Sequence, residues 1–159
     1  MDEKRLTYTI EEATILLEKY CVYQDRCHSE VEQKLRQMNI IREGQEKIIL
    51  HLFANNFLNE ERFAKSFVRG KYGQKRWGKM KIKAALKQKG ISDRNMISGF
   101  REIDEDTYLS NLQHLARKKH ELITEKNAYK KRQKLYLFLV QKGYEQDLIN
   151  EVINPYFLD

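Results

Sequence analysis

The residues of this chain best placed to do chemistry are its cations, which are concentrated in two blocks. Residues 62–92 contain 11 basic residues and no acidic one, and residues 117–134 contain 8 basic and 2 acidic residues. Together these blocks carry +17, whereas the rest of the chain carries −10, which leaves a formal net charge of +7. A solvated lysine-rich helix normally places glutamates four residues from its lysines. Positive charge this concentrated favours contact with a polyanion.

The first basic block contains the single tryptophan of the chain, Trp77, within the run Gln74-Lys75-Arg76-Trp77-Gly78-Lys79. Two interpretations of Trp77 remain open. The indole could pack into a junction between two helices, or it could stack on a base while neighbouring cations hold phosphates. The cations from Lys75 onward lack acidic residues close by in the sequence. We therefore predict an anion-contacting strip made of Arg69, Lys71, Lys75, Arg76, Trp77, Lys79, Lys83 and Lys87.

The second basic block is less one-sided, because it includes Glu121 and Glu125. A solvated connection between helices explains this composition as well as binding does. Its candidate residues form a secondary basic patch: Lys118, Lys119, Lys130, Lys131 and Arg132. If the helices that carry the two blocks stack on one another, the blocks could form one continuous strip.

Patterns typical of catalysis are missing from the sequence. There is no P-loop, no Rossmann glycine fingerprint, no GxSxG and no HExxH. The adjacent acids Glu60-Glu61 and Asp104-Glu105-Asp106 fall at expected helix starts, where they compensate the helix dipole. Cys21 and Cys27 are too few for a disulfide framework and lack the spacing of a zinc site, so we expect two reduced thiols. We expect neither an enzyme nor a cofactor or metal.

Composition favours an all-α protein. One proline and seven glycines supply too few turns for an all-β fold, and nine tyrosines with seven phenylalanines argue against disorder. The charged start, Met1 to Arg5, is followed by no apolar segment of a signal peptide, and no apolar run reaches membrane length. We therefore expect a cytoplasmic monomer that makes no membrane contact.

Three segments of the chain resemble one another: residues 34–40, 85–91 and 138–144. In each, a leucine precedes a glutamine by two positions, and Asn39, Gly90 or Gly143 then occupies the position where a helix can end in a left-handed turn. This periodicity predicts an elongated tandem array of three three-helix repeats, at 9–56, 57–101 and 102–159. Each repeat of about 50 residues is too small to be stable alone, so neighbouring repeats must pack together.

The helices expected to position the basic residues are 60–72 and 78–89. Asn59 is the predicted N-cap of the former, and Lys79, Lys83 and Lys87 form a stripe beside the buried face of the latter. In the first repeat, we expect a helix cap at Ser29. We expect the preceding helix to contain Ile15, Leu16, Lys19, Tyr20 and Tyr23.

These residues resemble the RecX family, regulators of the RecA recombinase. The resemblance is carried by Phe57–Arg69 (FLNEERFAKSFVR), Lys75–Gly78 (KRWG) and Ile82–Ile91 (IKAALKQKGI), and it extends from about Glu11 to Tyr156. It implies tandem three-helix units that bind RecA filaments along their helical groove. It also implies inhibition of RecA's ATPase, strand-exchange and coprotease activities, and so weaker recombination and SOS response, without catalysis by the regulator itself.

We therefore expect the RecA filament and single- and double-stranded DNA as partners. Two other functions remain open on the residues alone. The chain could be a general helical DNA- or RNA-binding protein with no recombinase partner. It could also be a helical-repeat adaptor for another protein, in which the charge is incidental.

Overall fold

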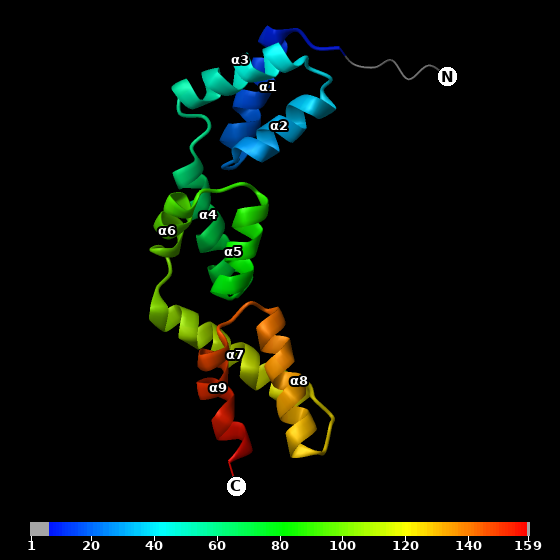
Figure 1. Cartoon of the computed structure of the whole chain (residues 1–159), viewed down its shortest axis with the longest axis vertical. Coiled ribbons are helices and arrows are strands. Elements are labelled where there is room, and N and C mark those ends of the chain that lie inside the picture. The colour runs from blue at the N-terminus through cyan, green and yellow to red at the C-terminus, as the bar shows by residue number, and fades with distance from the viewer. Residues whose placement is uncertain (1–6, 159) are drawn as a thin grey trace, which may run out of the picture.

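A computed structural model describes residues 7–158 of the chain, which contain nine α-helices, a terminal turn of 3-10 helix and no strand. The elements are α1 (Ile10–Tyr23), α2 (His28–Gln37), α3 (Arg42–Ala54), α4 (Glu60–Gly73), α5 (Lys79–Gln88), α6 (Asp93–Phe100), α7 (Glu105–Leu122), α8 (Ala128–Gln141), α9 (Gln146–Ile153) and η1 (Asn154–Phe157). They form three successive groups of three helices along one long axis (Figure 1). The predicted all-α, elongated tandem array is confirmed. The exact bounds of the repeats stay a prediction.

We call α1–α3, α4–α6 and α7–α9 the first, second and third repeats. Each begins with a helix whose N-terminus is capped by a polar side chain, since Thr9, Asn59 and Asp104 accept hydrogen bonds from backbone N–H groups of the first turn. The Asn59 cap, at 2.9 Å from the nitrogen of Arg62, confirms the prediction for α4. Among residues 7–158, no helix has the length and apolar content needed to cross a membrane.

The second helix of each repeat ends in a left-handed residue. Asn39, Gly90 and Gly143 have φ angles of 56°, 75° and 97°. In each case the following residue donates its N–H back to the carbonyl of the leucine five positions earlier, as in Ile91 N to Leu86 O at 3.1 Å. The repeated sequence segments therefore correctly predicted this left-handed turn in all three repeats.

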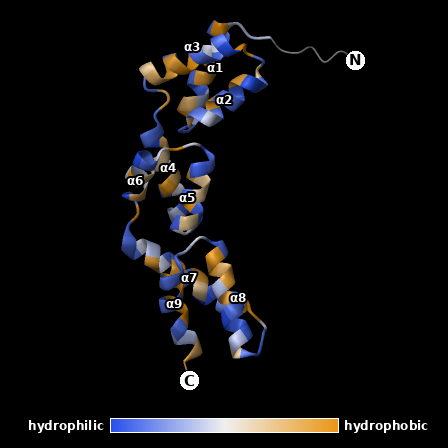
Figure 2. Cartoon of the chain, viewed as in Figure 1, coloured by the Kyte–Doolittle hydropathy of each residue, from blue (hydrophilic) through white to orange (hydrophobic). Residues whose placement is uncertain are grey.

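The first repeat has a hydrophobic core of its own, built mainly from Leu17, Leu35, Ile48, Leu52 and Leu58. The residues predicted for the first helix lie on α1, but they are not its buried side: α1 buries Ala13, Leu17 and Cys21, while Ile15, Leu16 and Tyr23 are exposed. Apolar and polar residues alternate along the helices of all three repeats (Figure 2). Besides its buried side, α1 carries exposed apolar residues, among them Ile15, Leu16 and Val22. Only the packing of α3 against it selects the buried side.

The second and third repeats share one continuous core, whose largest fully buried side chains are Ile82, Leu86, Tyr108, Leu112, Leu135, Leu139 and Tyr144. Cys27 of the first repeat is fully buried and belongs to this same core. Cys21 and Cys27 are free thiols, and burial raises the pKa of both above the ordinary value. The last two repeats therefore share one core, which the first repeat contacts at its α1–α2 corner.

The predicted cap at Ser29 is wrong. The N-cap of α2 is Cys27, which makes no side-chain capping bond, and Ser29 lies in the first turn. The Ser29 hydroxyl instead donates to the carbonyl of Lys89 in the second repeat at 3.1 Å. A serine that resembles a local cap is used here to join two repeats.

Candidate functional site

The N-terminus of α5, the helix that carries Lys79, Lys83 and Lys87 of the predicted strip, is capped by the third repeat. No side chain caps it locally. The N–H groups of Gly78 and Met80 donate to the carbonyls of Lys142 and Gly143, at 2.7 and 2.8 Å. These contacts satisfy backbone donors that a helix N-terminus otherwise leaves unpaired. The backbone segments at Gly78 and Gly143 are so close that a Cβ on Gly78 would lie 2.1 Å from the carbonyl carbon of Gly143.

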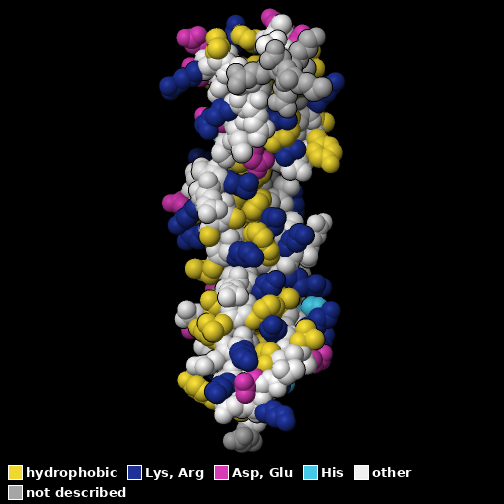
Figure 3. Space-filling model, turned by 90° about the vertical axis from the view of Figure 1, so that its right-hand side faces the viewer, with side chains coloured by type: hydrophobic (Ala, Val, Ile, Leu, Met, Phe, Trp, Pro, Cys, Tyr) yellow, Lys and Arg dark blue, Asp and Glu magenta, His cyan; other side chains and the backbone are white. Residues whose placement is uncertain are grey.

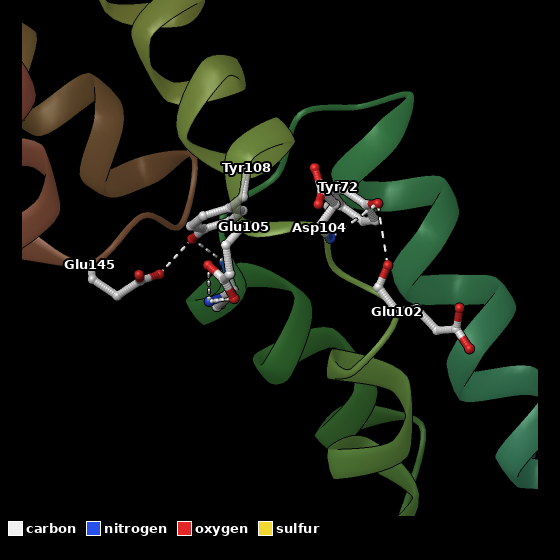
Figure 4. A network of polar contacts seen from close by, with 7 residues as sticks. Tyr72, Glu102, Asp104, Glu105, Tyr108 and Glu145 are labelled. Atoms are coloured by element: carbon white, nitrogen blue, oxygen red, sulfur yellow. Dashed lines mark hydrogen bonds and ion pairs between the residues drawn. The ribbon is translucent and has the colours of Figure 1, made fainter.

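Two tyrosines complete this joint between the second and third repeats. The Tyr108 hydroxyl accepts a hydrogen bond from the backbone nitrogen of Lys79 at 2.9 Å and donates to the Glu145 carboxylate, as drawn in Figure 4. The Tyr144 hydroxyl donates to the carbonyl of Arg76 at 2.8 Å. Burial raises the pKa of both phenols, so they remain neutral donors. The α4–α5 turn and the start of α5 are therefore held by groups from the third repeat.

Two members of the predicted strip are already paired with acids. The Lys79 Nζ lies 2.8 Å from Glu105 Oε1, and Arg69 lies 3.5 Å from Glu102 Oε2. Lys79 has no acidic residue close by in the sequence, yet the fold gives it an acidic partner. Its partner comes from α7, 26 residues later in the chain, and no sequence window around α5 could reveal it.

Four members of the strip are exposed and make no ion pair within residues 7–158: Lys75, Arg76, Lys83 and Lys87. The first two lie in the α4–α5 turn, and the other two lie one turn apart on the solvent side of α5. On the molecular face of Figure 3, Lys and Arg side chains are spread over the middle and lower parts, interleaved with hydrophobic ones. We call these four residues the open strip.

Trp77 and Lys71 are half-buried and interact with each other. The Lys71 Nζ lies 4.7 Å from the centroid of the Trp77 ring, and the Lys81 Nζ lies 4.3 Å from it. Part of Trp77 packs against the shared core, so the junction interpretation is correct for that part of the ring. Lys81 was missed by the sequence reasoning. Its position four residues after Trp77, on the face of α5 next to the ring, was the available signal.

Like the predicted strip, the secondary basic patch contains some cations that are exposed and others that already make contacts within the protein. Lys118 and Lys130 are exposed, and Lys131 is half-buried. The Lys119 Nζ lies 4.8 Å from the Phe138 ring centroid, and the Arg132 guanidinium donates to the side chains of Asn150 and Asn154 at 3.1 and 2.7 Å. Lys119 and Arg132 thus have contacts that stabilise the third repeat, which leaves Lys118 and Lys130 as the more accessible charges.

The two basic blocks meet at His114 of α7. Partial desolvation of the imidazole lowers its pKa below the ordinary 6.5, and the positive charges of Arg76, Lys118 and Arg117 lower it further. Arg76 belongs to the first block, whereas Arg117 and Lys118 belong to the second. Charges from both blocks therefore act on one imidazole, and a continuous strip stays a prediction.

This meeting point yields a pH prediction. In the free protein, His114 should titrate below pH 6.5. Phosphates bound beside Arg76 and Lys118 should raise that pKa, because they offset the positive charge around the imidazole. The complex then binds more protons than the free protein, so affinity should increase as the pH falls through the pKa of His114. Imidazole Cε1–H shifts, recorded by NMR against pH with and without an oligothymidylate, measure both values.

Arg76→Gln is the matched variant for this titration, since it removes one of the three cations and should move the pKa of free His114 back toward 6.5. A free-protein pKa at or above 6.5, or one unchanged when the oligonucleotide is bound, would contradict the prediction.

The fold and the site define an all-α repeat protein with an open basic strip on its middle repeat. Comparison with known proteins gives the family. The model described as "RecX, second three-helix domain" matches residues 59–96, and that described as "RecX, third three-helix domain" matches residues 106–153. The two matches together cover more than half of the chain and correspond to α4–α6 and α7–α9. The chain belongs to the RecX family.

Individual relatives agree with this assignment. The regulatory protein RecX of Clostridium botulinum strain Alaska E43 is 35% identical over 80% of this chain and 60% of the relative. That of Clostridium perfringens strain 13 is 29% identical over the same shares. The chain thus spans about 60% of the length of these relatives. The crystal structure of RecX from Lactobacillus salivarius superposes with a TM-score of 0.78 at 27% identity, covering 92% of this chain and 95% of that one.

Proposed function

We propose that this protein binds RecA nucleoprotein filaments and inhibits the ATPase, recombinase and coprotease activities of RecA, so that it modulates DNA repair and the SOS response. It acts in the cytoplasm by binding and not by catalysis, as a monomer without a cofactor. The relatives named "Regulatory protein RecX" support the regulatory part of this proposal.

The observation that carries the proposal is the open strip of Lys75, Arg76, Lys83 and Lys87. These four cations lack acidic partners among the described residues. Lys75 and Arg76 lie in the α4–α5 turn, and Lys83 and Lys87 lie on α5, whose start is held by the joint at Gly78. Unpaired cations close together repel one another, and a polyanion relieves that repulsion. A nucleoprotein filament is a long, regular polyanion, which suits an elongated protein with its charge arranged along its length.

The test is DNA-dependent ATP hydrolysis by RecA on single-stranded DNA, titrated with this protein. We expect hydrolysis to fall at or below one protein molecule per RecA. Strand exchange and RecA-stimulated repressor cleavage should fall in the same range. Full RecA activity in a several-fold excess of the protein would overturn the proposal.

A second function is general binding of single-stranded nucleic acid. It is favoured because the four cations of the open strip are already exposed in the free protein, before any partner protein binds. Five phosphate contacts on a single strand would give a slope of about −3.5 for log affinity against log salt. Binding to bare DNA and to RecA-coated DNA at equal salt separates the two functions. A RecA regulator should prefer the coated strand, whereas a general binder should be excluded from it.

A further inference from the structure

A groove of about 500 Å³ lies between α4 and α5, and the α1–α2 corner contributes to one of its walls. Its aromatic lining includes Phe67 and Trp77, and its cations include Lys71, Lys75 and Lys89. This volume falls in the range of about 300–1,000 Å³ that is usual for sites that take small organic groups. The groove thus joins flat apolar rings to positive charge.

The acids that line this groove are already paired. Asp25 binds the Arg62 guanidinium at 2.8 Å, and Glu30 binds the Lys89 ammonium at 3.1 Å. Lys71 and Lys75 have no acidic partner within residues 7–158. The unpaired charge of the groove is therefore positive, and it is complementary to an anion.

Trp77 is held in a fixed position before any ligand arrives. Its backbone nitrogen donates to the carbonyl of Lys71 at 2.9 Å, and the preceding residue, Arg76, has a left-handed φ of 53°. The Tyr144 hydroxyl binds the carbonyl of Arg76, so the third repeat stabilises this sparsely populated conformation. A ring that is already ordered loses little conformational freedom when a ligand stacks on it.

Within residues 7–158, no carboxylate forms an ion pair with either ammonium group near the Trp77 ring, those of Lys71 and Lys81. Stacking of a nucleobase on an indole is generally stronger than a cation–π contact of a partly exposed lysine. A base that enters the groove can therefore replace the Lys71 ammonium on the ring. The flexible Lys71 side chain is then free to bind the adjoining phosphate.

We propose that this groove takes one unstacked base of a single-stranded nucleic acid, with the base on the Trp77 ring and the flanking phosphates on Lys71 and Lys75. The open strip supplies contacts for the next phosphates, because Arg76 adjoins Lys75 and Trp77 in the same turn. An acidic peptide would satisfy the lysines but would leave the ring without a partner. This inference goes beyond the proposed function, since it concerns bare strands and requires no RecA.

The experiment uses the fluorescence of Trp77, the only tryptophan of the chain. Four probes of equal charge are titrated: an oligothymidylate, an abasic oligonucleotide of the same length, a DNA duplex and a poly-glutamate peptide. We expect the oligothymidylate to quench Trp77 emission. The abasic strand and the duplex should bind without comparable quenching, because they offer phosphates but no accessible base.

Two variants separate stacking from charge. Trp77→Ala should weaken oligothymidylate binding roughly tenfold, measured by anisotropy of a labelled strand, and should leave the affinity for the abasic strand unchanged. Lys71→Gln should weaken binding of both strands and keep the quenching at saturation. Tyr129→Ala is the matched control, because Tyr129 is an exposed aromatic on α8, outside the groove, and its loss should alter neither quenching nor affinity.

Equal quenching by the abasic strand, or no quenching by saturating oligothymidylate, would overturn the inference. So would quenching by poly-glutamate alone, which would identify a protein-binding groove. Inhibition of RecA is measured separately with unlabelled protein. If the protein inhibits RecA but the oligothymidylate does not quench Trp77, only the base-binding role of the groove is disproved. If the oligothymidylate quenches Trp77 but RecA is not inhibited, only the proposed function is disproved.

Discussion

Gly78→Ala should lower the free energy of unfolding by about 3 kcal/mol, through overpacking and the loss of two backbone hydrogen bonds. The added methyl group would lie 2.1 Å from the carbonyl carbon of Gly143 and 2.3 Å from the nitrogen of Tyr144. Both neighbours are backbone atoms, so no side chain can rotate away. The start of α5 must separate from the α8–α9 connection, which breaks the bonds from Gly78 and Met80 to that connection.

Urea denaturation followed by circular dichroism measures this loss, and thermal unfolding should show a midpoint lowered by roughly 6–12 °C. The matched control is Gly70→Ala. Gly70 lies inside α4, and an added Cβ there has no atom within 4 Å. That substitution should stabilise the protein by about 0.5–1 kcal/mol, because alanine favours the helix. Equal stabilities of the two variants would show that the Gly78–Gly143 contact is not close in solution.

Reversing two charges of the open strip, in the double variant Lys83→Glu and Lys87→Glu, should weaken binding to single-stranded DNA about 30-fold or more at moderate salt. Two phosphate contacts are lost, and two carboxylates then repel the strand. The slope of log affinity against log salt should become shallower by about 1.4. If the strip also contacts the filament, the concentration needed for half-inhibition of RecA should rise in parallel.

Lys79 is left unchanged in this variant, because it is bound to Glu105 and Lys79→Glu would also disrupt the joint between repeats. The matched control is Lys19→Glu with Lys47→Glu. Both lysines are exposed on the first repeat and make no ion pair within the described residues, so the net charge changes by the same amount away from the strip. An equal loss of affinity in the control would mean that overall charge, and not the open strip, governs binding.

Much of the architecture was predictable because the signals are local. The apolar spacing of Phe63, Ala64 and Val68 lies within a few helical turns, and the Asn59 cap and the Gly90 turn act on residues within five positions. The helices predicted at 60–72 and 78–89 are observed at Glu60–Gly73 and Lys79–Gln88. Failures came where two local solutions compete. On α1, Leu16 and Leu17 are equally apolar neighbours, and only contact with α3 decides that Leu17 is buried.

The sequence by itself determined that the chain is a helical repeat array with its positive charge on the middle repeat, because periodicity and charge are properties of neighbouring residues. The tertiary structure alone decided which of those charges remain available. Lys79 is bound by Glu105 of the next repeat, whereas Lys83 and Lys87, on the same helix, face solvent. It also brought Arg76 beside His114 and shaped the groove around Trp77. Ion pairs and grooves depend on distances between residues far apart in the chain, and those distances are set only when the repeats pack.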